Sequence, residues 1–360
     1  MAKSTEKPSP KTRFSVGVIR LIRVAAALLS VAIIGIAAVG IWFMVEVDRP
    51  VHSGSKPIDL IVPYGTSARG IVGMIQGAGL EVNERLFLGY AVLRGVQTEL
   101  MAGVYEIEPA ISTRGLVERL SRRDENQTEF RILEGWTVQQ ILEALSRQAE
   151  LRFDLQPAID KPAVLAKVLG MEAGHPEGWL YPDVFVVKKG TAASDLLKRS
   201  AAIQSAMLSR EWDKRAQGLP YRSLYEALIV ASIVEKETQY PGDREKVAAV
   251  FTNRLHAGMP LQADPTVIYG LGKDFNGDIT KKHLKQDTPY NTYTRKTLPP
   301  TPISNPGPRA VRAALNPADS RALYFVARGD GSSEFSDSLR EHNLAVDRYI
   351  KKIASQGAGR

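Results

Sequence analysis

The longest hydrophobic segment of the chain is an uncharged run of 22 residues at positions 24–45. Its length matches the hydrocarbon core of a bilayer, and Trp42 and Phe43 near its end are typical of a membrane interface. Basic residues precede the run in a tail at 1–23, and acidic residues follow it. The positive-inside rule therefore predicts a cytoplasmic N-terminus, with the rest of the chain outside the plasma (inner) membrane. A cleaved signal peptide is the alternative, but the run is long for one and no small-residue cleavage site follows. We expect an uncleaved, single-pass transmembrane helix.

A small α+β module is predicted after a polar linker at residues 46–57. Short apolar segments that suit strands alternate there with segments of helical periodicity. We expect strands at 58–62, 104–107 and 130–133, and helices at 68–76, 84–93 and 113–120. This β-α-α-β-α-β order places the module in the mixed α+β class.

The rest of the chain is predicted to be a larger mixed domain dominated by helices. Thr137 and Gln140 form a capping box that starts a helix ending near residue 147. The other expected segments are helices at about 195–217 and 243–256, a turn-rich stretch at 258–312, a hairpin with strands at 324–328 and 334–335, and a final helix at about 339–353.

Two glutamates, Glu235 and Glu237, end an apolar helix that begins after a capping box of Ser223 and Glu226. Proline and glycine should end this helix just past Tyr240. A helix turns about 100° per residue, so the two acids point to nearly opposite sides. Glu237 continues the apolar stripe of Val234, Ile233 and Val230, which lie three, four and seven residues earlier. A carboxyl on such a stripe is a candidate for a desolvated group that holds its proton, as acid catalysis needs. A solvated glutamate at the end of a core helix is the alternative, which spacing alone does not exclude.

Composition narrows the chemistry that this chain can carry. The 360 residues include no cysteine, which excludes disulfides, thiolate catalysis and Cys-ligated metals. Of the net charge of +8, residues 1–23 carry +5, so the basic pI is poor evidence for nucleic-acid binding. The five histidines are scattered without metal-ligand spacing, and no phosphate-binding loop or nucleophile elbow occurs. Of the catalytic chemistries considered, acid catalysis by a carboxyl group is the one that remains.

Polar and aromatic side chains are dense in the turn-rich stretch that follows the 243–256 helix. Loops held by a scaffold are where binding groups concentrate, and amides, hydroxyls and flat tyrosine rings suit a sugar polymer. Ordinary turn chemistry, in which Asn, Asp and Thr cap turns without binding anything, is the alternative. The side chains concerned are Gln262, Asp264, Thr266, Tyr269, Asn276, Tyr290, Asn291, Thr292 and Tyr293.

Several sequence motifs follow one another in a recognisable order. The first three are Ala-Ser-Ile-Val-Glu-Lys-Glu-Thr at 231–238, Val-Phe-Thr-Asn-Arg-Leu at 250–255 and Leu-Gln-Ala-Asp-Pro-Thr-Val-Ile-Tyr-Gly at 261–270. Others lie at 133–135, 177–183, 290–294, 298–300, 303–307 and 324–326. Together the motifs resemble those of the YceG-like family of endolytic murein transglycosylases, over roughly residues 58–350.

The resemblance implies a membrane-anchored lytic transglycosylase that cuts peptidoglycan strands between MurNAc and GlcNAc in mid-chain, leaves 1,6-anhydro-MurNAc ends and so terminates glycan elongation. It implies a LysM-like module at 58–127 and a catalytic domain at 128–355 with a lysozyme-like helical core. It places the catalytic acid at Glu237, the glutamate that the apolar stripe also favours. From motif position and side-chain type, the expected substrate-binding residues are Gln262, Asp264, Tyr269, Asn291 and Tyr293. Peptidoglycan synthases are suggested as partners, and we expect no cofactor and no metal.

One carboxyl suffices for the reaction that the resemblance implies. Glu237 protonates the glycosidic oxygen, and the resulting carboxylate takes a proton from the MurNAc C6 hydroxyl, which closes the anhydro ring without water. Ordinary glycosidases use two carboxylates. A hydrolytic muramidase with Asp264 or Asp243 as the second carboxylate is therefore one alternative. A non-catalytic glycan-binding anchor for wall synthases is the other.

Overall fold

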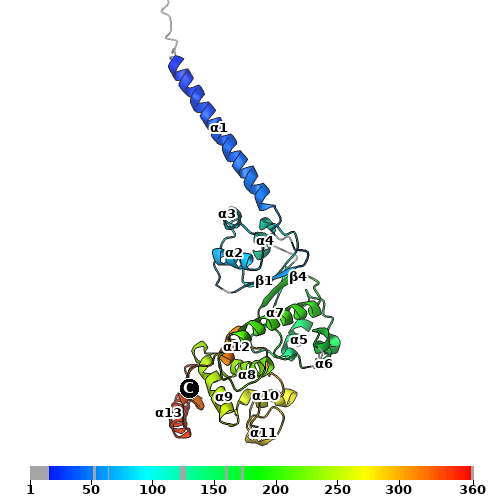
Figure 1. The fold of residues 1–360 in the computed structure, drawn as a ribbon, viewed down its shortest axis with the longest axis vertical. Helices are drawn as coiled ribbons and strands as arrows, with labels where there is room; N and C mark the ends of the chain where they lie inside the picture. Colours follow the sequence, from blue (N-terminus) through cyan, green and yellow to red (C-terminus); the bar gives the residue numbers. More distant parts are fainter. Residues whose placement is uncertain are drawn as a thin grey trace, which may run out of the picture. The chain divides into compact units, whose positions relative to one another are not determined.

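The chain forms two compact units, residues 1–124 and 125–360 (Figure 1). The computed structural model describes residues 16–51, 54–63, 65–121, 127–158, 161–171 and 174–357. Most of the predicted basic tail, up to residue 15, lies outside the described residues. The assignment of 58–127 as a module and 128–355 as a catalytic domain remains a prediction.

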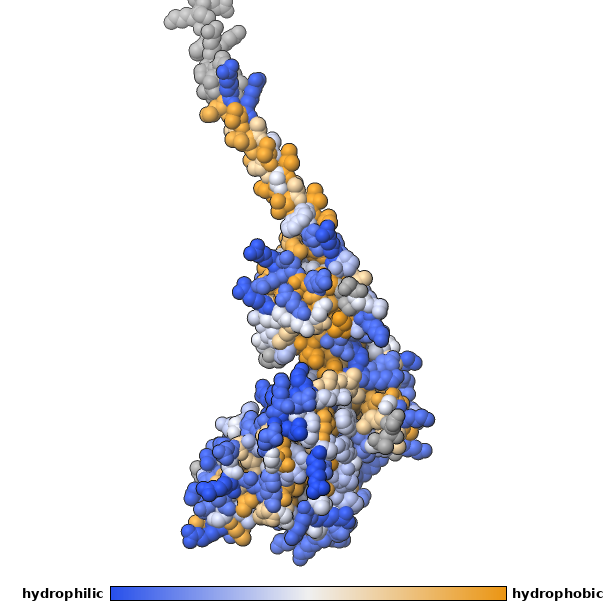
Figure 2. Space-filling view, in the orientation of Figure 1, coloured by the Kyte–Doolittle hydropathy of each residue, from blue (hydrophilic) through white to orange (hydrophobic). Residues whose placement is uncertain are grey.

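The apolar run near the N-terminus lies in one long helix, α1 (Val16–Val47). Its segment Arg20–Val47 is long and apolar enough to cross a membrane. Most large apolar side chains along this segment are exposed, whereas Phe43 is half-buried and Val47 is buried. Figure 2 shows the exposed ones as an almost continuous hydrophobic column. The helix extends past the predicted run at both ends, and its last residues replace the start of the expected linker.

The first unit also contains two neighbouring antiparallel strands and three helices. Strand β1 (Ile58–Val62) pairs with β2 (Gly103–Ile107), which places Leu60 opposite Tyr105. The helices are α2 (Ala68–Gly77), α3 (Glu84–Leu93) and α4 (Thr113–Leu120). Side-chain caps from Ser67, Asn83 and Ser112 start these helices, which explains why their first residues were predictable. The predicted element order up to residue 120 is confirmed.

The second unit opens with the antiparallel pair of β3 (Gln127–Arg131) and β4 (Val184–Lys188). The strand predicted at 130–133 instead spans 127–131. Only Thr128 and Phe130 of β3 are buried, and the polar residues Gln127, Glu129 and Arg131 give this segment no apolar run that would predict a strand. Helix α5 (Val138–Ser146) has the predicted capping box of Thr137 and Gln140. The remaining elements before the core are η1 (Gln156–Ala158), α6 (Pro162–Val168) and α7 (Ala193–Asp213).

Three helices form the core of the second unit: α8 (Leu224–Glu237), α9 (Arg244–His256) and α12 (Pro308–Leu315). Helix α12 packs against both α8 and α9, although the sequence predicted only turns there. The expected end of α8 past Tyr240 is also wrong. The helix ends at Glu237, because Thr238 is extended with φ −143° and ψ 130°. Buried side chains that join the three helices include Val230, Ile233, Val234, Val247, Phe251, Ala310 and Ala314.

Short elements and a hairpin complete the second unit. They are η2 (Pro241–Asp243), α10 (Asp264–Leu271), η3 (Gly272–Asp274), α11 (Lys281–Lys285), β5 (Tyr324–Ala327), β6 (Ser333–Ser336) and α13 (Leu339–Gly357). The predicted hairpin is confirmed as the antiparallel pair of β5 and β6. Phe325 of β5 meets Phe251 of α9 edge to face at 6.2 Å, which fastens the hairpin to the helical core.

Candidate active site

Glu237 is the last residue of α8, where the helix gives way to extended chain. Its side chain is partly exposed and forms no hydrogen bond or ion pair with any of the residues that the structure describes. Burial raises the pKa of Glu237 to about 7, the negative charge of Asp264 adds to the increase, and the Arg254 guanidinium opposes it. A helix C-terminus also disfavours negative charge. At neutral pH, roughly half of the Glu237 carboxyls therefore carry a proton.

Glu235, two residues earlier, has a different environment. Its Oε1 lies 3.1 Å from Arg244 Nη2, and its Oε2 accepts a hydrogen bond of 2.9 Å from the Gly307 N–H. Glu235 is only 7 % exposed, so it is more buried than Glu237, contrary to what the apolar stripe indicated. Arg244, which comes from the next helix, neutralises it. These contacts hold the end of α8 in place and occupy both Glu235 oxygens, whereas Glu237 has no such partner among the described residues.

Arg254 of α9 organises the loop beside Glu237. The side chain is 7 % exposed, and it donates to the Leu323 carbonyl at 2.7 Å and to the Leu261 carbonyl at 2.6 Å. It also reaches Gln262 Oε1 at 3.3 Å. Burial lowers the pKa of Arg254, whereas the charges of nearby groups, Glu237 among them, raise it. The sequence offered Arg254 only as part of a family motif, because a buried arginine on an apolar helix face shows no site signal by itself.

Gln262 occupies a left-handed backbone conformation, with φ +51°. Its N–H donates to the Thr292 carbonyl at 3.0 Å, which joins the start of the turn-rich stretch to its later part. The side chain is exposed. Non-glycine residues rarely adopt this conformation, and they persist in it where the surroundings fix the chain. Here the Arg254 contacts and the Thr292 bond supply that constraint.

Asp264 and Tyr293 form a pair that faces the same acid. The Tyr293 hydroxyl donates to Asp264 Oδ1 at 2.5 Å. Burial raises the pKa of Tyr293, and the hydrogen bond to Asp264 raises it further. Asp264 is exposed at the first residue of α10, and its charge acts on both Glu237 and Tyr293. The structure thus brings together Glu237, Asp264 and Tyr293, three of the predicted residues.

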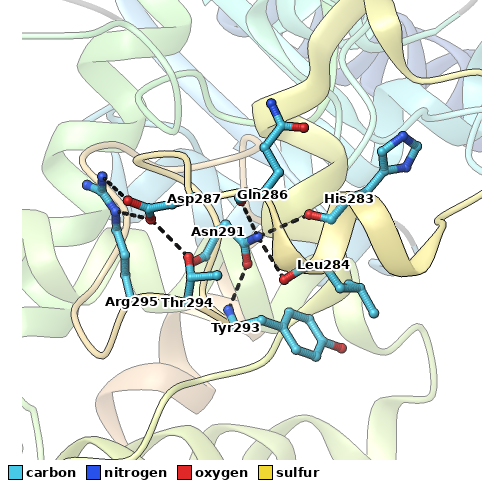
Figure 3. Close-up of polar contacts among 8 residues, drawn as sticks. All are labelled: His283, Leu284, Gln286, Asp287, Asn291, Tyr293, Thr294 and Arg295. Atoms are coloured by element: carbon cyan, nitrogen blue, oxygen red, sulfur yellow. Dashed lines mark hydrogen bonds and ion pairs between the residues drawn. The ribbon is translucent and has the colours of Figure 1, made fainter.

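Asn291 organises the loop and does not face the solvent. Its side chain is fully buried, and its Nδ2 donates to the backbone carbonyls of His283, Leu284 and Gln286 at 3.1, 3.1 and 2.7 Å. Its Oδ1 accepts from the Tyr293 N–H at 2.9 Å (Figure 3). Direct substrate contact, which the sequence predicted for Asn291, does not fit this burial. Asn291 instead fixes the conformation of the backbone that positions Tyr293 for its hydrogen bond to Asp264.

Tyr269 points to a second buried carboxyl, that of Glu177. The Tyr269 hydroxyl donates to Glu177 Oε2 at 3.0 Å, while Glu177 Oε1 accepts from the Val138 N–H at 2.9 Å and from Asn305 Nδ2 at 3.0 Å. Burial raises the pKa of Glu177 to about 8, although these hydrogen bonds lower it. The sequence did not single out Glu177, which lies in the 177–183 motif.

A cavity of about 730 Å³ opens next to these groups. Its walls include Glu177, Lys236, Tyr269 and Tyr290, and the two tyrosine rings lie 5.0 Å apart. The lining also includes Pro265 and Ile268 of α10, the helix that begins with Asp264. Rings and amides along a hollow of this size suit a saccharide.

Asp243, the other candidate for a second carboxylate, has a structural role. It is only 3 % exposed, and its Oδ2 accepts a 2.6 Å hydrogen bond from the Ser333 N–H of the hairpin. A buried carboxylate that is committed to the backbone cannot reach a substrate. Among the described residues, no cluster of three or more His, Asp or Glu side chains is placed to bind a metal.

Comparison with known proteins gives a consistent result. The sequence profile of the YceG-like family matches residues 60–348. The chain is 30 % identical to the endolytic murein transglycosylase of Bacillus subtilis strain 168, over 84 % of this chain and 88 % of that protein. It is 27 % identical to the enzyme of the same name from Streptococcus pneumoniae D39, over 86 % of this chain and 62 % of that protein. A crystal structure of a YceG-like protein from Listeria monocytogenes superimposes with a TM-score of 0.51 at 32 % identity, covering 81 % of this chain and 99 % of that one. The chain therefore belongs to the YceG-like family.

Proposed function

We propose that this protein is a membrane-anchored endolytic murein transglycosylase that cleaves peptidoglycan between MurNAc and GlcNAc, with Glu237 as its catalytic acid and base. The observation that carries the proposal is the state of Glu237, a carboxyl with a pKa of about 7 and no hydrogen-bond partner among the described residues. The relatives named endolytic murein transglycosylases supply the substrate class.

The first step uses the proton that Glu237 holds. Glu237 donates it to the glycosidic oxygen, and positive charge develops at the MurNAc anomeric carbon as the bond breaks. Asp264 is exposed next to the acid, so its carboxylate is placed to stabilise that charge. Arg254 favours the carboxylate form of Glu237 and so eases the loss of its proton.

The second step returns the proton to the same group. The Glu237 carboxylate takes the proton of the MurNAc C6 hydroxyl, and the C6 oxygen bonds to the anomeric carbon to close a 1,6-anhydro ring. The proton count of the enzyme is unchanged after the cycle. A pKa close to 7 suits a group that must both give and take a proton at neutral pH.

The finer features of the proposal concern the substrate and the anchoring. Gln262, Asp264, Tyr269 and Tyr293 would contact the glycan, with the cavity walled by Tyr269 and Tyr290 as part of its path. The first unit would act as a LysM-like module and α8, α9 and α12 as a lysozyme-like core. Helix α1 would anchor the protein in the plasma membrane with its N-terminus in the cytoplasm, close to peptidoglycan synthases.

A hydrolytic muramidase is the second candidate, because Asp264 lies close enough to influence Glu237 electrostatically. In that case Asp264 would activate water, and the products would have reducing ends. Anhydro ends are lighter by one water, so mass spectrometry of the released muropeptides distinguishes the two reactions.

The deciding experiment digests purified sacculi with the detergent-solubilised protein and with its Glu237→Gln variant. Loss of the acid should reduce product release by about a hundredfold to ten-thousandfold. Glu245→Gln is the matched control. Glu245 is exposed in the first turn of α9, and the change makes the same replacement of a carboxyl group by an amide. Equal anhydro product from wild type and Glu237→Gln would disprove the role of Glu237. Absence of product from wild type as well would favour the glycan-binding anchor.

A further inference from the structure

Helix α3 presents two large apolar side chains, Val92 and Leu93, that none of the described residues of the first unit covers. Val92 and Leu93 in its last turn are 61 % and 63 % exposed. The opposite face of the helix is buried in the unit through Phe87, Tyr90 and Ala91. Two adjacent large apolar side chains with this exposure, on a helix whose other face is already packed, indicate a partner outside the unit.

This face adjoins the end of α1. A Cβ added to Gly89 would lie 3.4 Å from Phe43 Cε2, so Gly89 of α3 rests against the Phe43 ring. Val92 and Leu93 follow Gly89 by three and four residues and share its side of the helix. Figure 1 draws α3 beside the last turns of α1, and the two helices are in contact.

The end of α1 is built into the unit without a loose connection. Val47, its last residue, is fully buried, and Asp48 forms an ion pair with Arg114 at 2.6 Å. The Val51 N–H then donates to the Ile111 carbonyl at 2.8 Å. The chain that follows α1 is therefore packed into the unit from its first residues. These contacts fix the position of α3 along the axis of α1.

The sequence of α1 shows where the bilayer would end. About 20 apolar residues span the hydrocarbon core, and the uncharged run 24–45 has Trp42 and Phe43 at its far end. Aromatic residues at this position belong to the membrane–water interface. Because α3 touches Phe43, α3 lies at the same depth. Arg85 and Arg94, exposed at its two ends, match the negative charge of anionic headgroups.

We propose that α3 is an interfacial helix, which inserts Val92 and Leu93 into the headgroup–acyl boundary of the bilayer that α1 crosses. The inference rests on the anchoring role proposed for α1 and is independent of the chemistry at Glu237. It gives the first unit a fixed face toward the membrane, held by a second contact as well as by the span.

The absence of cysteine allows a direct test on the full-length chain. Single cysteines replace Leu93, as Leu93→Cys, and Gly73, as Gly73→Cys, and each carries a nitroxide spin label in vesicles of phosphatidylethanolamine and phosphatidylglycerol. Gly73 is the control because it is exposed on α2, which Figure 1 draws farther from α1, and an added Cβ there meets nothing within 4 Å. Collision rates with oxygen, which concentrates in lipid, and with a neutral nickel chelate, which concentrates in water, are compared.

The label at Leu93 should collide several-fold more with oxygen than with the chelate, and the label at Gly73 should show the reverse. Equal, water-like values at both positions would overturn the interfacial helix. A third label, at Val39→Cys within α1, reports on the anchor itself. Water-like values at Val39 would overturn the anchor and the interfacial helix together. Digestion of sacculi by the same proteins tests the enzymatic proposal separately.

Discussion

Breaking the ion pair of Glu235 and Arg244 on one side should strongly destabilise the second unit, because a buried charge would be left unpaired. Glu235 and Arg244 are 7 % and 6 % exposed, and Glu235 Oε1 lies 3.1 Å from Arg244 Nη2. In Glu235→Gln, the Arg244 guanidinium stays buried but loses its nearest carboxylate. The next one, Glu134, is 3.8 Å away on a side chain that is 42 % exposed.

The size of the loss follows from these contacts. Removing one partner of a buried pair costs about 3–5 kcal/mol, since an uncompensated charge remains. Glutamine keeps an acceptor for the Gly307 N–H. Burial and the charge of Glu235 both raise the pKa of Glu134, and the second cause is absent in the variant, so the Glu134 carboxylate partly compensates the charge of Arg244. We therefore expect the lower end, about 3 kcal/mol. The double variant Glu235→Gln with Arg244→Met should lose less than the single variant, because no buried charge is left.

Urea unfolding followed by tryptophan fluorescence measures this effect. Trp136, Trp179 and Trp212 all lie in the second unit, and only Trp42 lies in α1, so the signal reports mainly on the affected unit. The midpoint should fall with little change in the m-value. A loss under about 1 kcal/mol, typical of exposed pairs, would refute the reasoning. So would a double variant that is less stable than Glu235→Gln.

Four further predictions concern the active site and the loop beside it. Product release should fall as pH rises above about 7, where Glu237 loses its proton; a rate that is flat from pH 6 to about 9 would argue against this acid. Because the pKa of Glu237 is raised on folding from 4.5, its contribution to stability is complete below pH 4.5 and is lost as pH rises through about 7, which urea midpoints at several pH values can check. Asp264→Asn should move the alkaline limb of the pH–rate profile to lower pH, since a negative charge that raises the pKa of Glu237 is removed; an upward movement would contradict the electrostatic assignment. Asn291→Ala should destabilise the unit by about 1–3 kcal/mol, because three backbone carbonyls lose their donor; an unchanged urea midpoint would show that water replaces the amide.

Much of the fold could be predicted where side chains cap helices or alternate cleanly. Thr137 with Gln140, and Asn83 before α3, mark helix starts through local hydrogen bonds that the sequence states directly. Helix α12 was missed because Pro308 and the prolines before it resemble turn sequence. Proline is well tolerated at the first helical positions, however, and the buried alanines and leucine of α12 are explained only by packing on α8 and α9.

The candidate site was predictable in its chemistry but less so in its geometry. The apolar stripe and the family motif both selected Glu237, yet the stripe did not foresee that Glu235 would be the more buried acid. Its burial depends on Arg244, which lies nine residues later and on another helix. Asn291 illustrates the converse limit. A loop amide can bind a ligand or bind the loop itself, and only the three carbonyls around it distinguish these roles.

The position of Glu237 at the terminus of α8 ties the acid to the number of residues in that helix. One residue inserted between Ser223 and Glu237 would swing the carboxyl by about 100° around the helix axis and shift it by about 1.5 Å along it. The Ser223 cap fixes the other end of the segment. Insertions and deletions among proteins that share this chemistry should consequently fall outside α8. Substitutions within the helix preserve the position of the acid, whereas a change in its number of residues does not.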